Sequence, residues 1–209
     1  IPGEDIAIQV SQLEGRHQSV AMRDVLDRRR YTHADRLLGA RHLQSHLMQA
    51  RAFADLLESA NVRVGRDVFE LVWVAANLEP VQCSHGNVLT PQARLGDDRL
   101  DALLVPGLWG NPDVSSVIQR HRKVISHVSQ LDADISLWSY CTGVSLIAAT
   151  GRLNGHKATI TWWMAEQAQQ MFTQVDWKLR QSCVVDDRIY TASGATGYLP
   201  ICLEIIERE

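Results

Sequence analysis

The sequence lacks the features of membrane, secreted and zinc-binding proteins. Its 209 residues include only four cysteines, with no CxxC pair and no Cys/His cluster, so a structural zinc site is not expected. Nothing requires disulfides, which suits a reducing cytoplasm. No run of about 18 apolar residues occurs, and no signal peptide opens the chain. We therefore expect a cytoplasmic protein without a membrane partner.

An excess of one charge is also lacking. Lys plus Arg number 21 and Asp plus Glu number 24, which gives a net charge of −3. Nucleic-acid binders usually carry a strong basic bias, so we do not expect this segment itself to bind DNA. Hydrophobic residues make up 45% of the chain, which is normal for a globular core. The length favours a single domain over residues 1–209.

The most informative segment is an apolar run that leads directly into a cysteine. Residues 135–138 precede Cys141, and Thr142, Gly143 and a helix-compatible run at 144–150 follow it. This order predicts a strand, a sharp turn and a helix, with Cys141 at the tip of the turn. The N-terminus of such a helix favours a thiolate or a bound anion. The alternative is a cysteine that only packs in the core.

Segments typical of strands and helices alternate along the chain. Strands are expected at residues 6–10, 68–76, 100–106, 135–138, 183–186 and 188–192, and a short hairpin at 81–84 and 87–89. Helices are expected at residues 19–29, 35–59, 112–131, 144–150, 162–172 and 196–207. Several strands are apolar throughout, which indicates a parallel sheet covered on both faces. Ligands of such folds bind beyond the carboxyl ends of the strands.

The predicted helix at 35–59 carries an apolar stripe. Its members recur at three- and four-residue spacing: Leu43, Leu47, Ala50, Ala54 and Leu57. This periodicity predicts a helix that faces the core, with a dimer contact as the alternative.

Four motifs in a fixed order resemble a known family. They lie at residues 101–107 (Asp-Ala-Leu-Leu-Val-Pro-Gly), 140–143 (Tyr-Cys-Thr-Gly), 151–159 and 191–194. The set is similar to the PfpI/ThiJ-type, class I glutamine-amidotransferase-like superfamily. More narrowly, it resembles the N-terminal domain of AraC-family transcriptional regulators of that type. The resemblance implies an α/β, flavodoxin-like fold, with a mostly parallel sheet, helices on both faces and a cysteine nucleophile elbow.

The resemblance also implies a role in transcription regulation. Such a domain senses a small-molecule effector and is followed by a helix-turn-helix domain, through which alone DNA would be bound. The chain begins at Ile1 without Met and ends at Glu209 in a helix-like segment, so we expect a piece of a longer protein. A homodimer is expected because it is the commonest oligomer.

We expect no catalysis at the elbow. Related regulators carry Thr-His-Trp after the elbow helix, and here Thr161 stands where that His would be. Threonine cannot act as a base at neutral pH. His156 and His85 are expected to be turn or structural residues. Cys141 remains a candidate nucleophile, and the alternatives are a cysteine hydrolase, hydratase or amidase of this fold, or a cysteine redox sensor.

A ligand pocket at the elbow is expected instead, without cofactor or metal. The N–H groups of Thr142 and Gly143, with Gly107 and Leu108 opposite, suit a carboxylate or another small anion. Converging tryptophans would hold a quaternary ammonium, so a betaine-like amino-acid derivative is one hypothesis. Trp162 and Trp163 nevertheless occupy positions more typical of a core. The candidate ligand-binding residues are Gly107, Leu108, Trp109, Cys141, Thr142, Gly143, Thr161, Trp162, Glu14 and Ser193.

Overall fold

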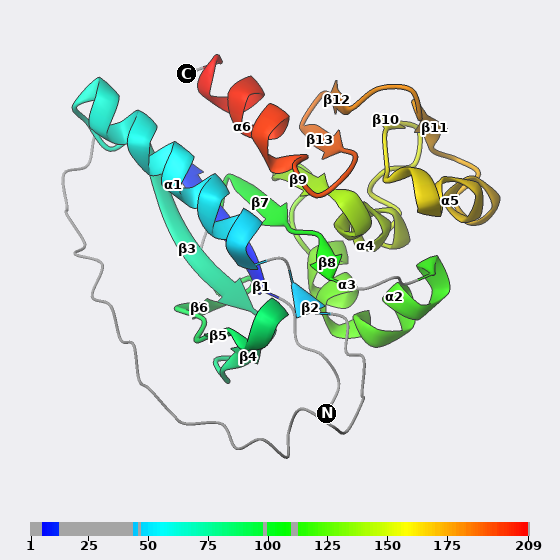
Figure 1. Cartoon of the computed structure of the whole chain (residues 1–209), viewed down its shortest axis with the longest axis horizontal. Coiled ribbons are helices and arrows are strands. Elements are labelled where there is room, and N and C mark those ends of the chain that lie inside the picture. Colours follow the sequence, from blue (N-terminus) through cyan, green and yellow to red (C-terminus); the bar gives the residue numbers. More distant parts are fainter. Residues whose placement is uncertain (1–5, 13–43, 46, 98–99, 110–112, 209) are drawn as a thin grey trace.

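A seven-stranded sheet forms the centre of the molecule (Figure 1). The structure is a computed structural model that describes residues 6–12, 44–45, 47–97, 100–109 and 113–208. The strand order is β12-β13-β9-β7-β1-β3-β6. The strands are β1 (Ile6–Gln12), β3 (Phe69–Ala75), β6 (Ala93–Arg94), β7 (Ala102–Val105), β9 (Ser136–Tyr140), β12 (Cys183–Asp186) and β13 (Ile189–Ala192).

Most strands of the sheet point in one direction. β7 pairs in parallel with β9, β9 with β13, and β3 with β6. β12 runs antiparallel to β13, and β1 runs antiparallel to both of its neighbours, β3 and β7. The mostly parallel sheet is thus confirmed. The reversal of β1 was not predicted, because an apolar run identifies a strand but not its direction.

Helices cover both faces of this sheet. α1 (Leu47–Val64) and α6 (Tyr198–Ile206) lie side by side on one face, while α2 (Val114–Arg120), α3 (Arg122–Ser129) and α4 (Val144–Ala149) cover the other (Figure 1). α5 (Ala165–Met171) packs its buried Ala168 on the second side. Neighbouring strand residues enter opposite cores, as Leu103 and Leu104 do, which explains the continuous apolar runs.

Short elements complete the fold. β4 (Val81–Gln82) and β5 (Val88–Leu89) form the expected hairpin around the 3₁₀ turn η2 (Ser84–Gly86). The others are β2 (Gln44–Ser45), β8 (Leu108–Trp109), β10 (Lys157–Ala158), β11 (Asp176–Trp177) and the 3₁₀ turns η3 (Cys141–Gly143) and η4 (Trp162–Met164). None of the helices that the structure describes is long and apolar enough to cross a bilayer.

The predicted helix at 112–131 is wrong as a single element. It is broken at His121 into α2 and α3, because His121 has φ −109° and ψ 28° and ends the first helix. His121 is buried, and no Gly or Pro marks the break in the sequence. Asp113 starts α2 by accepting a hydrogen bond from the Ser116 N–H at 2.9 Å.

The predicted helix at 35–59 is confirmed from Leu47 onward and is wrong at residues 44–45, which form the strand β2. α1 begins at Leu47, and Leu47, Ala50, Ala54 and Leu57 are buried, as expected for a core-facing stripe. Leu43 and the predicted helix at 19–29 lie outside the described residues. α1 continues to Val64 because buried Asn61 fastens its end to β3. The Asn61 amide donates to Phe69 O at 2.8 Å and accepts from the Val68 and Phe69 N–H groups.

Candidate functional site

The predicted elbow is present at the carboxyl end of β9. The strand ends at Tyr140, the turn η3 follows at Cys141, and α4 begins at Val144. Cys141 has φ +57°, a left-handed conformation that an L side chain rarely adopts. Strained backbone of this kind concentrates at functional sites, where the surrounding structure holds it in place.

Gly143 allows the elbow to sit directly on the end of β7. A Cβ atom at Gly143 would overlap Pro106 O and would lie 2.8 Å from Val105 O. The φ of Gly143 is −61°, so the backbone itself would accept any residue. Space, and not conformational freedom, therefore requires glycine here.

Thr142 ties the elbow to the turn after β7. Its hydroxyl accepts a hydrogen bond from the Leu108 N–H at 2.6 Å and donates to Leu108 O at 3.2 Å. Both residues are buried. The Leu108 N–H, one of the expected anion donors, is thus engaged within the chain in this structure.

The thiol of Cys141 is buried, which disfavours its thiolate form. Only 1% of Cys141 is exposed, and burial raises the pKa of its thiol above the ordinary value. The Thr142 N–H and the hydroxyls of Thr142 and Thr161 lower this pKa in part. No histidine or carboxylate among the described residues contributes to the shift. The sequence had led us to expect an elbow that favours a thiolate, and the structure instead favours the thiol because desolvation outweighs the donors.

Alkylation of Cys141 by iodoacetamide should be slow at pH 7.5 and should accelerate through pH 9, because the thiolate is the nucleophile. The alkylation rate of each cysteine is measured by mass spectrometry of its peptide at a series of pH values. Burial also raises the pKa of Cys183 to about 11 and of Cys202 to about 12. Each of the three thiols therefore ionises at a lower pH in the unfolded chain than in the folded protein. They should stabilise the fold below about pH 8.5, and this contribution to the free energy of unfolding should be lost as the pH rises further. Rapid alkylation of native Cys141 at pH 7 would contradict the buried thiol.

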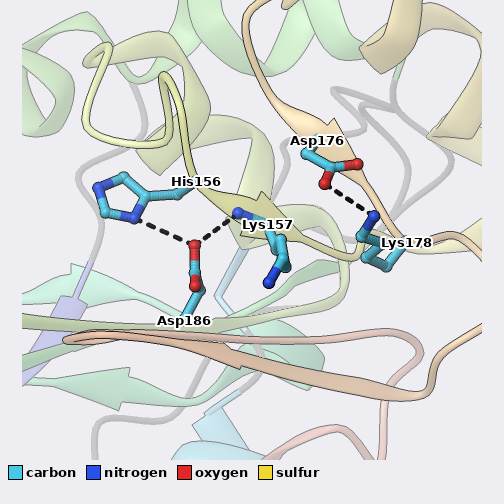
Figure 2. A network of polar contacts seen from close by, with 5 residues as sticks. All are labelled: His156, Lys157, Asp176, Lys178 and Asp186. Atoms are coloured by element: carbon cyan, nitrogen blue, oxygen red, sulfur yellow. Dashed lines mark hydrogen bonds and ion pairs between the residues drawn. The ribbon is translucent and has the colours of Figure 1, made fainter.

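His156 is engaged away from the thiol. Its Nδ1 lies 3.3 Å from Oδ2 of Asp186, which also accepts the Lys157 N–H at 2.8 Å (Figure 2). These two contacts lower the pKa of Asp186, with the Lys157 N–H the larger cause. Figure 2 also shows the ion pair between Lys178 and Asp176, at 2.7 Å. This network joins the β10–β11 pair to β12. His156, which the sequence places in a turn, therefore has a structural role.

No metal centre is evident in the described part of the chain. No three His, Cys, Asp or Glu side chains there form a group that could hold an ion. His85 is exposed in the η2 turn, with φ +61°.

The two tryptophans after Thr161 are exposed, so their expected place in a core is wrong. Trp162 is 80% exposed and Trp163 39%, and their rings meet edge to face with centroids 5.5 Å apart. Met164 is the buried residue of η4. A single 3₁₀ turn can bury only one side, and the sequence does not show which.

The remaining candidate residues differ in how far they are buried and in whether the structure describes them. Thr161 is fully buried at the start of η4, beside Cys141. Ser193 is partly exposed just after β13, and its N–H donates to Ser182 O at 2.8 Å. Glu14 and the side chain of Trp109 lie outside the described residues.

Tyr140 belongs to the elbow and was missed by sequence reasoning. Its side chain is fully buried, and its ring meets that of Tyr198, at the start of α6, with centroids 6.1 Å apart. Burial and the neighbouring Cys141 raise the pKa of its hydroxyl, whereas the Gly107 N–H lowers it. The available signal was a tyrosine hydroxyl directly before the cysteine, at the end of the strand.

A separate cavity of about 1060 Å³ lies away from the elbow. It is lined at the amino ends of the strands by Asp101, Ser136 and Arg188, with Trp138 further along β9. None of the expected site residues lines it.

Comparison with known proteins relates the chain to one family. The model of the DJ-1/PfpI family matches residues 52–208. The HTH-type transcriptional regulator GbdR of Pseudomonas aeruginosa is 26% identical over 167 residues, which cover 78% of this chain and 43% of GbdR. This chain thus spans less than half the length of the curated relatives it matches.

Solved structures share the fold. An AraC family transcriptional regulator from Pseudomonas putida superposes with a TM-score of 0.61 at 17% identity, over 79% of this chain and 86% of that chain. Drosophila melanogaster DJ-1beta gives a TM-score of 0.57 at 19% identity, over 79% of this chain and 84% of that chain. At these identities the likeness establishes the α/β fold alone.

Proposed function

Because this chain belongs to the DJ-1/PfpI family, we propose that it is the ligand-sensing domain of an AraC-type transcription factor. Its similarity to GbdR, an HTH-type regulator, supports this role. A small metabolite binds beside Cys141 and shifts the arrangement of a cytoplasmic homodimer. DNA is bound only through a separate helix-turn-helix domain.

The observation that carries this proposal is a strained, buried cysteine with no base beside it among the described residues. Nucleophilic cysteines need a base or a cationic neighbour that makes the thiolate. Burial instead raises the pKa of Cys141, and His156 is engaged by Asp186. The same burial disfavours a redox sensor, which needs an exposed thiol of low pKa.

The proposed ligand carries a carboxylate. The N–H groups of Gly107, Thr142 and Gly143 are its proposed donors, while that of Leu108 is already engaged by Thr142. A betaine-like derivative would also place its cation against an aromatic face, for which Trp109 and the exposed Trp162 are the candidates. Ser193 and Glu14 complete the proposed contacts.

Cys141→Ala tests sensing against catalysis. We expect the variant to bind acetate, glycine or trimethylglycine within a few-fold of the wild-type affinity, because the thiol is not the main ligand contact. Isothermal titration calorimetry on both proteins measures this. A covalent thioester on Cys141 in mass spectrometry, or substrate turnover that the variant abolishes, would favour the hydrolase alternative instead.

A further inference from the structure

Two hydroxyl groups beside the Cys141 thiol are buried without a well-formed hydrogen bond, although the Gly107 N–H approaches one of them and the Cys141 thiol the other. They are those of Tyr140 and Thr161, and both side chains are fully buried. The two residues come from different elements, the end of β9 and the residue before η4. Buried hydroxyls are nearly always satisfied, so two such groups in one place require an explanation.

The neighbouring hydroxyls show that the chain satisfies such groups elsewhere. Thr142, Ser139 and Ser145 each donate to a backbone carbonyl, at 3.2, 2.8 and 2.6 Å. Thr159, two residues before Thr161, donates to Gln181 O at 2.9 Å. Among the described residues, the buried hydroxyls without a partner are therefore those of Tyr140 and Thr161, while the indole N–H of Trp138, on the same strand as Tyr140, is a further unpaired buried donor.

We infer that Tyr140 and Thr161 are ligand-recognition residues whose hydroxyls donate hydrogen bonds to the carboxylate of the bound metabolite. This inference rests on the proposed function and deepens it. Two hydroxyl donors match the two oxygens of one carboxylate. The Gly107 N–H lies close enough to Tyr140 to act on its hydroxyl, which adds a backbone donor on the same side. Among the described residues, no acidic side chain contributes to the pKa shift of Tyr140 or Cys141.

An unpaired buried hydroxyl destabilises the free protein, while pairing with the ligand recovers that loss. Removing either hydroxyl should therefore have opposite effects on the two states. The free protein should keep or gain thermal stability, and ligand affinity should fall. A residue with a merely structural hydrogen bond shows the reverse pattern.

The test compares Tyr140→Phe and Thr161→Val with two matched controls. Thr159→Val removes a buried hydroxyl that is bonded, and Tyr190→Phe removes a tyrosine hydroxyl that accepts from Arg208 at 2.9 Å. Melting temperature is measured without ligand, and affinity for acetate and trimethylglycine by calorimetry. We expect the first two variants to bind about ten- to a hundredfold more weakly with no loss of melting temperature. The controls should melt lower and bind as the wild type does.

Three other results would overturn the inference, and they separate it from the proposed function. Wild-type affinity in both test variants would remove Tyr140 and Thr161 from the site, while leaving a sensor domain. A fall in their melting temperature as large as that of Thr159→Val would show that the hydroxyls are satisfied by an internal water. If the wild-type protein binds neither carboxylate, the carboxylate ligand of the proposed function fails, and the inference fails with it.

Discussion

Replacing Gly143 with Ala should destabilise the protein by about 3 kcal/mol, near the upper end of what overpacking usually costs. The added methyl group would overlap Pro106 O and approach Val105 O to 2.8 Å, and both are backbone atoms that cannot rotate away. Helical propensity alone predicts the opposite sign, since Gly143 has helical φ and Ala is favoured there by about 1 kcal/mol. Urea denaturation monitored by circular dichroism measures the difference.

Gly65→Ala is the matched control for this substitution. Gly65 has φ +75° and no heavy atom within 4 Å of an added Cβ, so only the conformational penalty of about 1 kcal/mol applies. If Gly143→Ala were no less stable than Gly65→Ala, the end of β7 would be free to move away from the elbow.

Thr142→Val should also destabilise strongly, by about 2–3 kcal/mol. Valine has nearly the same shape, but it leaves the buried N–H and C=O of Leu108 without the hydroxyl that pairs with both. The turn after β7 is then held less firmly against the elbow, so ligand affinity should fall together with stability. Denaturation and calorimetry on the same variant measure the two effects.

Thr142→Ser separates the hydroxyl from the methyl group. Serine keeps both hydrogen bonds to Leu108 and should lose only about 1 kcal/mol, from one buried methyl. Equal losses in the two variants would mean that packing, and not hydrogen bonding, holds this turn.

The strands and the elbow could be predicted because their signals are local. Apolar runs bounded by Gly, Pro or Asp identified β3, β7, β9 and β13, and the Cys141-Thr142-Gly143 order identified the turn. The break at His121 could not be predicted, since no Gly, Pro or other turn residue marks it. Helix propensity continues through His121, and propensity alone is a weak guide to where a helix ends.

The chemistry of the site was less accessible from the sequence. The position of Cys141 was predictable, but the direction of its pKa shift depends on how far the surrounding chain removes it from water. The Tyr140 hydroxyl is unpaired because no acceptor lies near it in the folded chain, and a sequence pattern does not show this. The exposure of Trp162 likewise follows from the orientation of a single turn.

The position of the reversed strand β1 in the sheet limits where the domain can be truncated. It is hydrogen-bonded to β3 on one side and β7 on the other, so it closes the middle of the sheet. The family model begins only at residue 52, after β1. A fragment trimmed to residues 52–208 would therefore expose two facing strand edges, and open edges recruit strands from other molecules. β1 thus protects the interior of this sheet against self-association, although it lies outside the part of the chain that the family model matches.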